Sequence, residues 1–166
     1  MAAASRDELI EQTHAEQRGW RALVDAVGRD RMNEPGPMGA WTFKDVAGHL
    51  AGWRNRRVAQ LEAVGRREPP PPDPWPAELE DDDRINDWIR ERDSTRSLDD
   101  VLADYDGSFD RLAAAISALP DDVLRNPGAL PGVDEPLLEV DWFSHLRDEH
   151  EPAIRAWLER SARPVS

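Results

Sequence analysis

Apolar residues recur every three to four positions along most of this 166-residue chain, and this spacing constrains the fold more than any other feature. It is the period of a helix with one buried face, and no stretch alternates apolar and polar residues as a half-buried strand does. Four such segments are long enough to be main helices. The sequence therefore predicts an all-α protein, a four-helix bundle that forms a single domain over residues 1–166.

Capping residues mark where the helices begin. Ser5 and Glu8 have the spacing of a capping box, and Gly28 offers a stop for the first helix. Thr42 is the expected N-cap of the second helix, and Ser97 that of the third. The expected buried faces of the four helices are Leu9, Thr13, Trp20, Leu23, Val24 and Val27; Phe43, Val46, Ala47, Leu50, Trp53, Val58 and Leu61; Val101, Leu102, Tyr105, Phe109, Leu112, Ile116 and Leu119; and Phe143, Leu146, His150, Ile154, Trp157 and Leu158.

The connections are rich in proline. Segment 68–76 cannot be helix interior, because proline lacks a backbone N–H and clashes with the preceding turn. We expect a stiff Pro-rich crossover between helices two and three, followed by a short extra helix around 85–89; a ligand segment for an SH3-type module is the less favoured alternative. The fourth helix is expected to begin near Pro136 and to run to Leu158, with Pro152 kinking or restarting it.

The balance of charges and the lack of cysteine exclude several classes of function. With 34 acidic and 21 basic residues the net charge is −13, which opposes binding to nucleic acid or to an anionic membrane surface. Without cysteine there is no disulfide, no thiolate metal ligand and no cysteine nucleophile. The N-terminus lacks the pattern of a signal peptide, and no run of 18 apolar residues occurs. We therefore expect a soluble cytoplasmic protein.

Three histidines are the strongest candidates for a functional site: His49 on helix two, and His145 and His150 on helix four. On a regular helix His145 and His150 point about 140° apart, so they do not both face one ion unless Pro152 distorts the helix. Glu149 is an alternative partner, four residues after His145. A divalent metal (Zn, Ni or Mn) held by these residues is therefore one interpretation. The other is that the histidines are hydrogen-bonded core residues without a metal.

Tryptophans and one asparagine complete the candidate site. Trp41 and Trp142 lie at element ends or off the buried stripe, and with Trp53 and Trp88 they are the candidates to line a substrate pocket. Packing without a binding role is the alternative for each of them. Asn86 either turns its amide toward the open end of the bundle or caps a helix.

Segment 41–53, with the sequence WTFKDVAGHLAGW, resembles the second-helix signature of the DinB/YfiT-like superfamily, in which Trp, Thr or Ser, Lys-Asp-Val and His-Leu recur. The resemblance implies a four-helix bundle. In many members, one histidine of helix two and a His-x-x-x-His pair of helix four bind a divalent metal. His49 matches the first position. If His150 is the second histidine of that pair, the first position, four residues earlier, holds Leu146. If His145 is the first histidine, the second position, four residues later, holds Glu149.

Segments 85–89, 97–102 and 145–158 look most like the ClbS/DfsB branch of this superfamily. That branch resembles self-protection proteins that open or hydrolyse a reactive, electrophilic natural product and do not require the metal triad. The leading hypothesis is therefore a ClbS/DfsB-like protein in which His49, His150 and Asn86 activate water and orient a small molecule.

Two further functions stay open. One is a metal-dependent DinB-like hydrolase or thiol transferase that uses His49, His145 and either His150 or Glu149. The other is a non-enzymatic protein that binds and sequesters a small molecule. The expected partners are a small-molecule ligand and a second copy of the chain, through exposed apolar helix faces.

Overall fold

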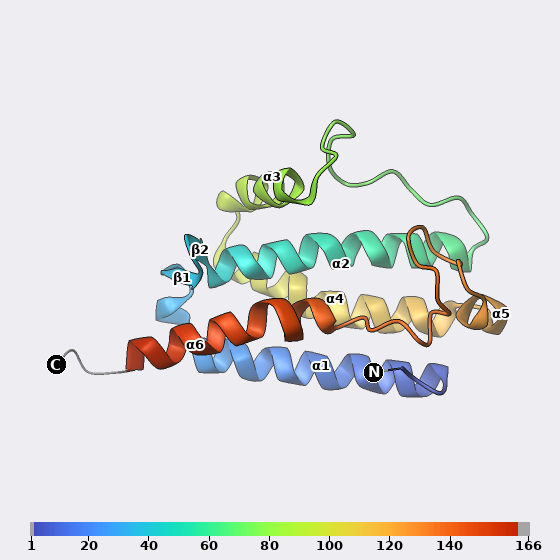
Figure 1. Ribbon diagram of the computed structural model, residues 1–166, viewed down its shortest axis with the longest axis horizontal. Coiled ribbons are helices and arrows are strands. Elements are labelled where there is room, and N and C mark those ends of the chain that lie inside the picture. Colours follow the sequence, from blue (N-terminus) through green and yellow to red (C-terminus); the bar gives the residue numbers. More distant parts are fainter. Residues whose placement is uncertain (1, 163–166) are drawn as a thin grey trace.

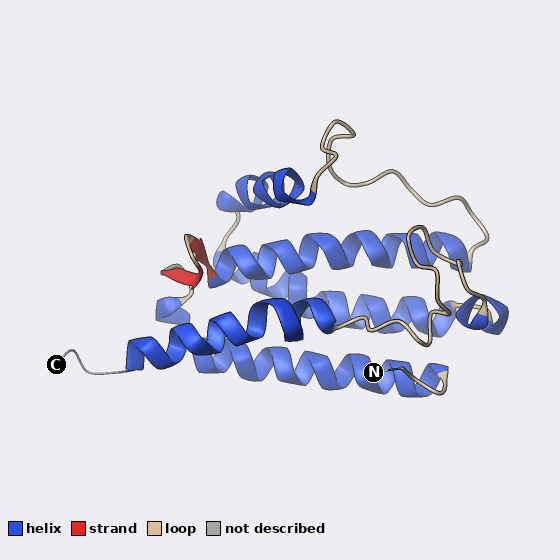
Figure 2. Ribbon diagram, in the orientation of Figure 1, coloured by secondary structure: helices blue, strands red, loops and turns tan. Residues whose placement is uncertain are grey.

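Four long helical segments run along the length of the molecule in the computed structural model, which describes residues 2–162 (Figure 1). Helix α4 packs against both α1 and α2. Figure 2 shows how little of the described chain is strand. The prediction of an all-α bundle is confirmed. The elements are α1 (Arg6–Val27), the 3-10 turn η1 (Arg29–Arg31), β1 (Pro35–Met38), β2 (Trp41–Thr42), α2 (Phe43–Gly65), α3 (Asp82–Ser94), α4 (Leu98–Ala118), α5 (Asp121–Arg125), the π-helical turn η2 (His145–His150) and α6 (Glu151–Ala162).

The predicted caps begin the helices where expected. The Ser5 hydroxyl accepts a hydrogen bond from the backbone N–H of Glu8 at 3.2 Å, and Ser97 caps α4 in the same way. Thr42 and Asp45 form a reciprocal capping box, with bonds of 2.8 and 3.1 Å between backbone N–H groups and side-chain oxygens. Both orphan donors are satisfied, so the start of α2 is well defined. His49 therefore sits about two turns into a firmly anchored helix.

Aromatic side chains of three helices meet in the core. Trp20 of α1 stacks on Phe43 of α2 with ring centroids 5.1 Å apart, and it meets Tyr105 of α4 edge-on at 4.7 Å. Most of the expected stripes are buried, as predicted. Trp53 is the main exception, because it is half-buried and packs on the opposite side of α2, against Trp75. A second small apolar cluster thus lies under the crossover, with Trp75, Ile85 and Ile89 as its buried members.

The crossover after α2 runs away from the bundle and then leads into α3, which lies over α2 (Figure 1). An ion pair between Arg56 and Asp73 ties it to α2. Asp81 then caps α3 by accepting a hydrogen bond from the N–H of Arg84 at 2.8 Å. The predicted crossover and extra helix are both present, and α3 closes one side of the region around His49.

The fourth helix was predicted to begin near Pro136, and this is wrong. Turns occupy most of the stretch up to Ser144, and the helix proper begins at His145. The backbone before it finds partners elsewhere: Leu138 accepts a hydrogen bond from Ala3 at 2.7 Å and donates one to Leu124 at 3.4 Å. Because these long-range bonds satisfy the backbone, the apolar residues are buried without a helix.

Two small elements lie in connections for which no helix or strand was predicted. Helix α5 follows Pro120, which is well placed at a helix start because its missing N–H is not needed there. Strands β1 and β2 form an antiparallel hairpin just before α2. Gly36 in this hairpin has a φ of 137°, and a Cβ there would come within 2.5 Å of the Trp157 indole. The hairpin therefore docks closely on α6.

None of the helices in the described part of the chain combines the length and the apolar character needed to cross a bilayer.

Candidate metal centre

Three histidine side chains converge between α2 and η2. The Nε2 atom of His145 lies 2.7 Å from Nε2 of His49 and 3.3 Å from Nε2 of His150. One ring nitrogen from each residue lies within 4.8 Å of the other two. Two nitrogens that bind one zinc ion in a tetrahedral site lie roughly 3.3 Å apart. The cluster therefore has the dimensions of a three-histidine metal site.

The π-helical turn explains how His145 and His150 can face the same point. A regular helix would point them far apart, but η2 is wound so that residues five apart align. The N–H of Glu151 accordingly bonds to the carbonyl of Leu146, five residues earlier. Pro152 follows at once and has no N–H to donate to the preceding turn, which favours a local change of winding. The distortion expected near Pro152 is present, and it removes the geometric objection to the pair.

Burial keeps two of the imidazoles neutral. It lowers the pKa of His49 to about 3, with further lowering from His145 and His150, while Asn86 opposes the shift. Burial also lowers the pKa of His150 to about 4; His145 adds to this and Glu149 opposes it. His49 and His150 are 4% and 6% exposed. At neutral pH both rings are uncharged, which is the form that binds a metal.

The second ring nitrogens differ among the three histidines. Nδ1 of His145 lies 3.1 Å from a carboxylate oxygen of Glu149, a pairing that orients the ring and makes it a better ligand. Nδ1 of His49 and Nδ1 of His150 are enclosed and have no hydrogen-bond partner among the described residues. Glu149, predicted as an alternative ligand, lies beside Nδ1 of His145, and the cluster of converging ligand atoms consists of the three histidines.

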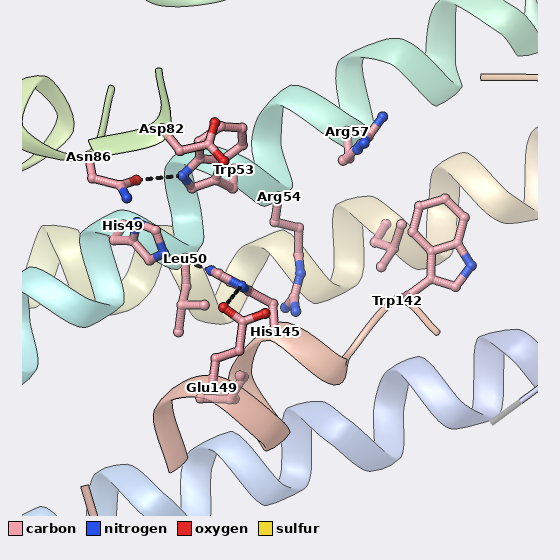
Figure 3. Close-up of a pocket in the computed structure, with 12 residues that line it drawn as sticks. His49, Leu50, Trp53, Arg54, Arg57, Asp82, Asn86, Trp142, His145 and Glu149 are labelled. Atoms are coloured by element: carbon pink, nitrogen blue, oxygen red, sulfur yellow. Dashed lines mark hydrogen bonds and ion pairs between the residues drawn. The ribbon is translucent and has the colours of Figure 1, made fainter. Parts of the chain in front are cut away.

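A cavity of about 500 Å³ opens beside the histidines (Figure 3). It combines an apolar wall with several polar and charged groups, as small-molecule sites commonly do. Its lining residues are His49, Leu50, Trp53, Arg54, Arg57, Asp82, Asn86, Leu112, Trp142, His145, Leu146 and Glu149. His150 lies behind this surface and reaches the cluster from the core side.

Asn86 of α3 lies at the cavity as expected. Its carbonyl oxygen accepts a hydrogen bond from the indole N–H of Trp53 at 2.8 Å (Figure 3). This bond fixes the amide plane and leaves the NH₂ group to face the cavity and His49. Asn86 is therefore fixed at the wall of the cavity, next to His49.

The four candidate tryptophans lie in different surroundings. Trp53 and Trp142 line the cavity, and Trp142 is fixed by a bond from its indole to the carbonyl of Leu137 at 3.0 Å. Trp41 lies behind His49, with ring centroids 5.5 Å apart, outside the lining. Trp88 is also outside it, packed on the second apolar cluster. Two of the four are thus placed to touch a ligand.

Two arginines of the cavity were missed by the sequence analysis. Arg54 and Arg57 both line it from α2. A signal for Arg54 existed, because it falls on the buried stripe at four-residue spacing between Leu50 and Val58. A charged side chain at such a position is rarely buried without a purpose.

The donor set fits a divalent ion. Three imidazole nitrogens, two of them on neutral buried rings, face one point at the edge of an open cavity. Three protein ligands with a free coordination position are typical of catalytic rather than structural zinc sites. The arrangement thus has the features of a metal centre with access for a small molecule.

Comparison with known proteins places the chain in a family. The family model of the mycothiol maleylpyruvate isomerase N-terminal domain matches residues 13–143. Searches of curated proteins and of solved structures found no match. The matched span includes His49 and ends before His145, so the C-terminal histidines rest on geometry alone. Membership of the ClbS/DfsB branch stays a prediction. The chain belongs to the mycothiol maleylpyruvate isomerase N-terminal domain family, within the DinB/YfiT-like superfamily.

Proposed function

We propose that this protein is a divalent-metal-dependent enzyme that acts on a small organic molecule bound in the cavity. The convergence of the Nε2 atoms of His49, His145 and His150 carries the proposal. Neutral imidazoles suit Zn²⁺ and Ni²⁺, whereas Mn²⁺ prefers oxygen ligands and is the weakest binder of the three.

The three histidines would hold the ion, and Glu149 would keep Nε2 of His145 directed at it through the bond to Nδ1. When bound at such a site, a divalent ion is a Lewis acid that lowers the pKa of a bound water or thiol. The chain's own residues supply the remaining functions, which are binding, orientation and exclusion of solvent.

Substrate orientation falls to Asn86 and to the apolar wall. The Asn86 amide, held by Trp53, can donate to a substrate oxygen in the cavity. Leu50, Leu112 and Leu146 line the cavity and exclude water from the substrate body. Asn86 thus acts as a binding residue beside the metal ligands, rather than as a proton carrier.

A thiol cosubstrate is the second part of the proposal. The chain has no cysteine, so thiol chemistry at this site requires a thiol from a small molecule. The name of the matched family refers to mycothiol and to maleylpyruvate. We therefore expect mycothiol, or a thiol of similar size, to enter the cavity next to the three histidines.

The test uses untagged protein stripped of metal and reloaded with zinc or cobalt(II). With mycothiol, the cobalt form is expected to develop the near-ultraviolet absorption of a cobalt–thiolate bond. Maleylpyruvate is then offered with and without mycothiol, and turnover should require both metal and thiol. A cobalt spectrum unchanged by mycothiol, together with no metal-dependent turnover, would overturn the proposal.

The same preparations test the two other functions expected from the sequence. Hydrolysis of an electrophile such as a p-nitrophenyl ester by stripped protein, lost in His150→Ala, would support the metal-free ClbS-like reaction instead. Binding of a small molecule without turnover under any metal condition would support sequestration.

A further inference from the structure

We propose that Arg54 is an anion-binding residue of the cavity and that it recognises the carboxylate of a small molecule with an apolar body. The inference deepens the proposed function, on which it rests, by naming the class of ligand that occupies the cavity. It concerns a residue that is not part of the metal cluster.

The guanidinium of Arg54 is held in the cavity by aromatic rings. Its Cζ atom lies 4.0 Å from the ring centroid of Phe109 and 4.6 Å from that of Tyr105. Cation–π contacts of this kind fix the guanidinium against the rings and leave its edge for hydrogen bonds. In Figure 3 the side chain extends from α2 toward the space beside His145.

The edge of this guanidinium lacks an acceptor. Nη1 of Arg54 is enclosed and has no hydrogen-bond partner among residues 2–162, and the hydroxyl of Tyr105 beside it is in the same state. Burial lowers the pKa of the Arg54 guanidinium, and the neighbouring Tyr105 hydroxyl and, after it, the Glu16 carboxylate oppose this shift. Neither Glu16 nor any other described carboxylate forms an ion pair with Arg54. An unpaired cation is costly to bury. Nη1 itself is enclosed, but Arg54 lines the cavity, so an anion bound there would pair with the part of the guanidinium that faces the cavity.

Arg57 differs from Arg54 because its guanidinium already has hydrogen-bond partners. It lines the same cavity one turn further along α2, but its Nη1 already donates to Gln60 at 3.1 Å and to the carbonyl of Pro131 at 2.9 Å. Of the two arginines that line the cavity in the described chain, Arg54 is the one whose Nη1 has no hydrogen-bond partner.

The surroundings of Arg54 favour a carboxylate on an apolar body. A guanidinium binds a planar carboxylate through two parallel hydrogen bonds, and it can bind phosphate in the same way. The apolar wall of the cavity is what favours a carboxylate on an apolar body over inorganic phosphate. Leu50, Leu112 and Leu146 line the same cavity and offer apolar contact to the rest of the ligand. A volume of about 500 Å³ accommodates a molecule larger than acetate.

The test is calorimetric titration of metal-free protein with benzoate, after the chelator has been dialysed away. Benzamide is the neutral control ligand, and inorganic phosphate is the alternative anion. We expect saturable benzoate binding, at least about tenfold weaker in Arg54→Met and changed less than about twofold in Arg57→Met, which also removes one positive charge from the cavity. Benzamide and phosphate should bind more weakly than benzoate.

Several results would overturn the assignment. They are equal benzoate affinity in wild type and Arg54→Met, no saturable binding of benzoate, or phosphate binding tighter than benzoate. A purely structural Arg54 would lower the melting temperature of Arg54→Met and leave benzoate affinity unchanged. If that variant does not fold, Arg54→Lys carries the comparison, with a loss of at least about threefold expected because the fork is gone. The protein is metal-free in all of these titrations, so the benzoate affinities can be interpreted even if the metal proposal fails.

Discussion

Metal binding should raise the thermal stability of this protein, and removal of any one of the three histidines should abolish the rise. His49 lies on α2, and His145 lies 96 residues later on η2. An ion held by both segments can bind only the folded chain, because the unfolded chain does not bring them together. The binding free energy therefore adds to the free energy of unfolding.

The size of the effect follows from mass action. Free metal at 100 times its dissociation constant stabilises the native state by about 2.7 kcal/mol. For a chain of 166 residues, each kcal/mol raises the melting temperature by about 2–4 °C. We therefore expect a rise of about 5–11 °C when stripped protein is loaded with zinc.

Differential scanning calorimetry on untagged protein provides the measurement. His49→Ala, His145→Ala and His150→Ala should each lose most of the rise at the same free zinc concentration. His14→Ala is the matched control, because His14 lies on α1 outside the cluster and should leave the rise intact. A wild-type melting temperature that does not respond to zinc, nickel or manganese would refute the reasoning, as would an undiminished rise in His49→Ala.

Three further predictions concern residues around the site. Glu149→Gln should weaken zinc affinity by about 10- to 100-fold in a competition titration, because the carboxylate supports a ligand; unchanged affinity would contradict this role. Gly48→Ala should lower the free energy of unfolding by about 1–3 kcal/mol, because the new Cβ would lie 2.5 Å from the buried Asp93 carboxylate. Gly19→Ala is the control, because Gly19 has open space around it and the substitution should not lower the free energy of unfolding. Urea unfolding measures both variants. Thr42→Ala should cost about 1 kcal/mol by the same assay, and no loss would mean that the capping box does not anchor α2.

The bundle was predictable because its signals are local. Helical spacing, the caps at Ser5, Thr42 and Ser97, and the proline run each act within a few residues, and each has its expected effect. The start of the fourth helix was not predictable in this way. It depends on the hydrogen bond that the Leu138 carbonyl accepts from Ala3 and on the one that the Leu138 N–H donates to Leu124, and both partners are distant in sequence.

The candidate site was predictable only in part, for a related reason. The three histidines could be named, but their convergence depends on the π-helical turn η2, which the period of a regular helix does not describe. Pro152 pointed to a distortion there without specifying its direction. Arg54 carried a signal as a cation on an apolar stripe, and the aromatic rings of Tyr105 and Phe109 that hold it became apparent only in the structure.

Anomalous X-ray diffraction from crystals of the zinc-loaded, untagged protein tests the central claim most directly. The account predicts one strong zinc peak within about 2.0–2.3 Å of the Nε2 atoms of His49, His145 and His150. No zinc peak at the cluster in crystals grown with zinc, or a peak bound elsewhere on the chain, would contradict it.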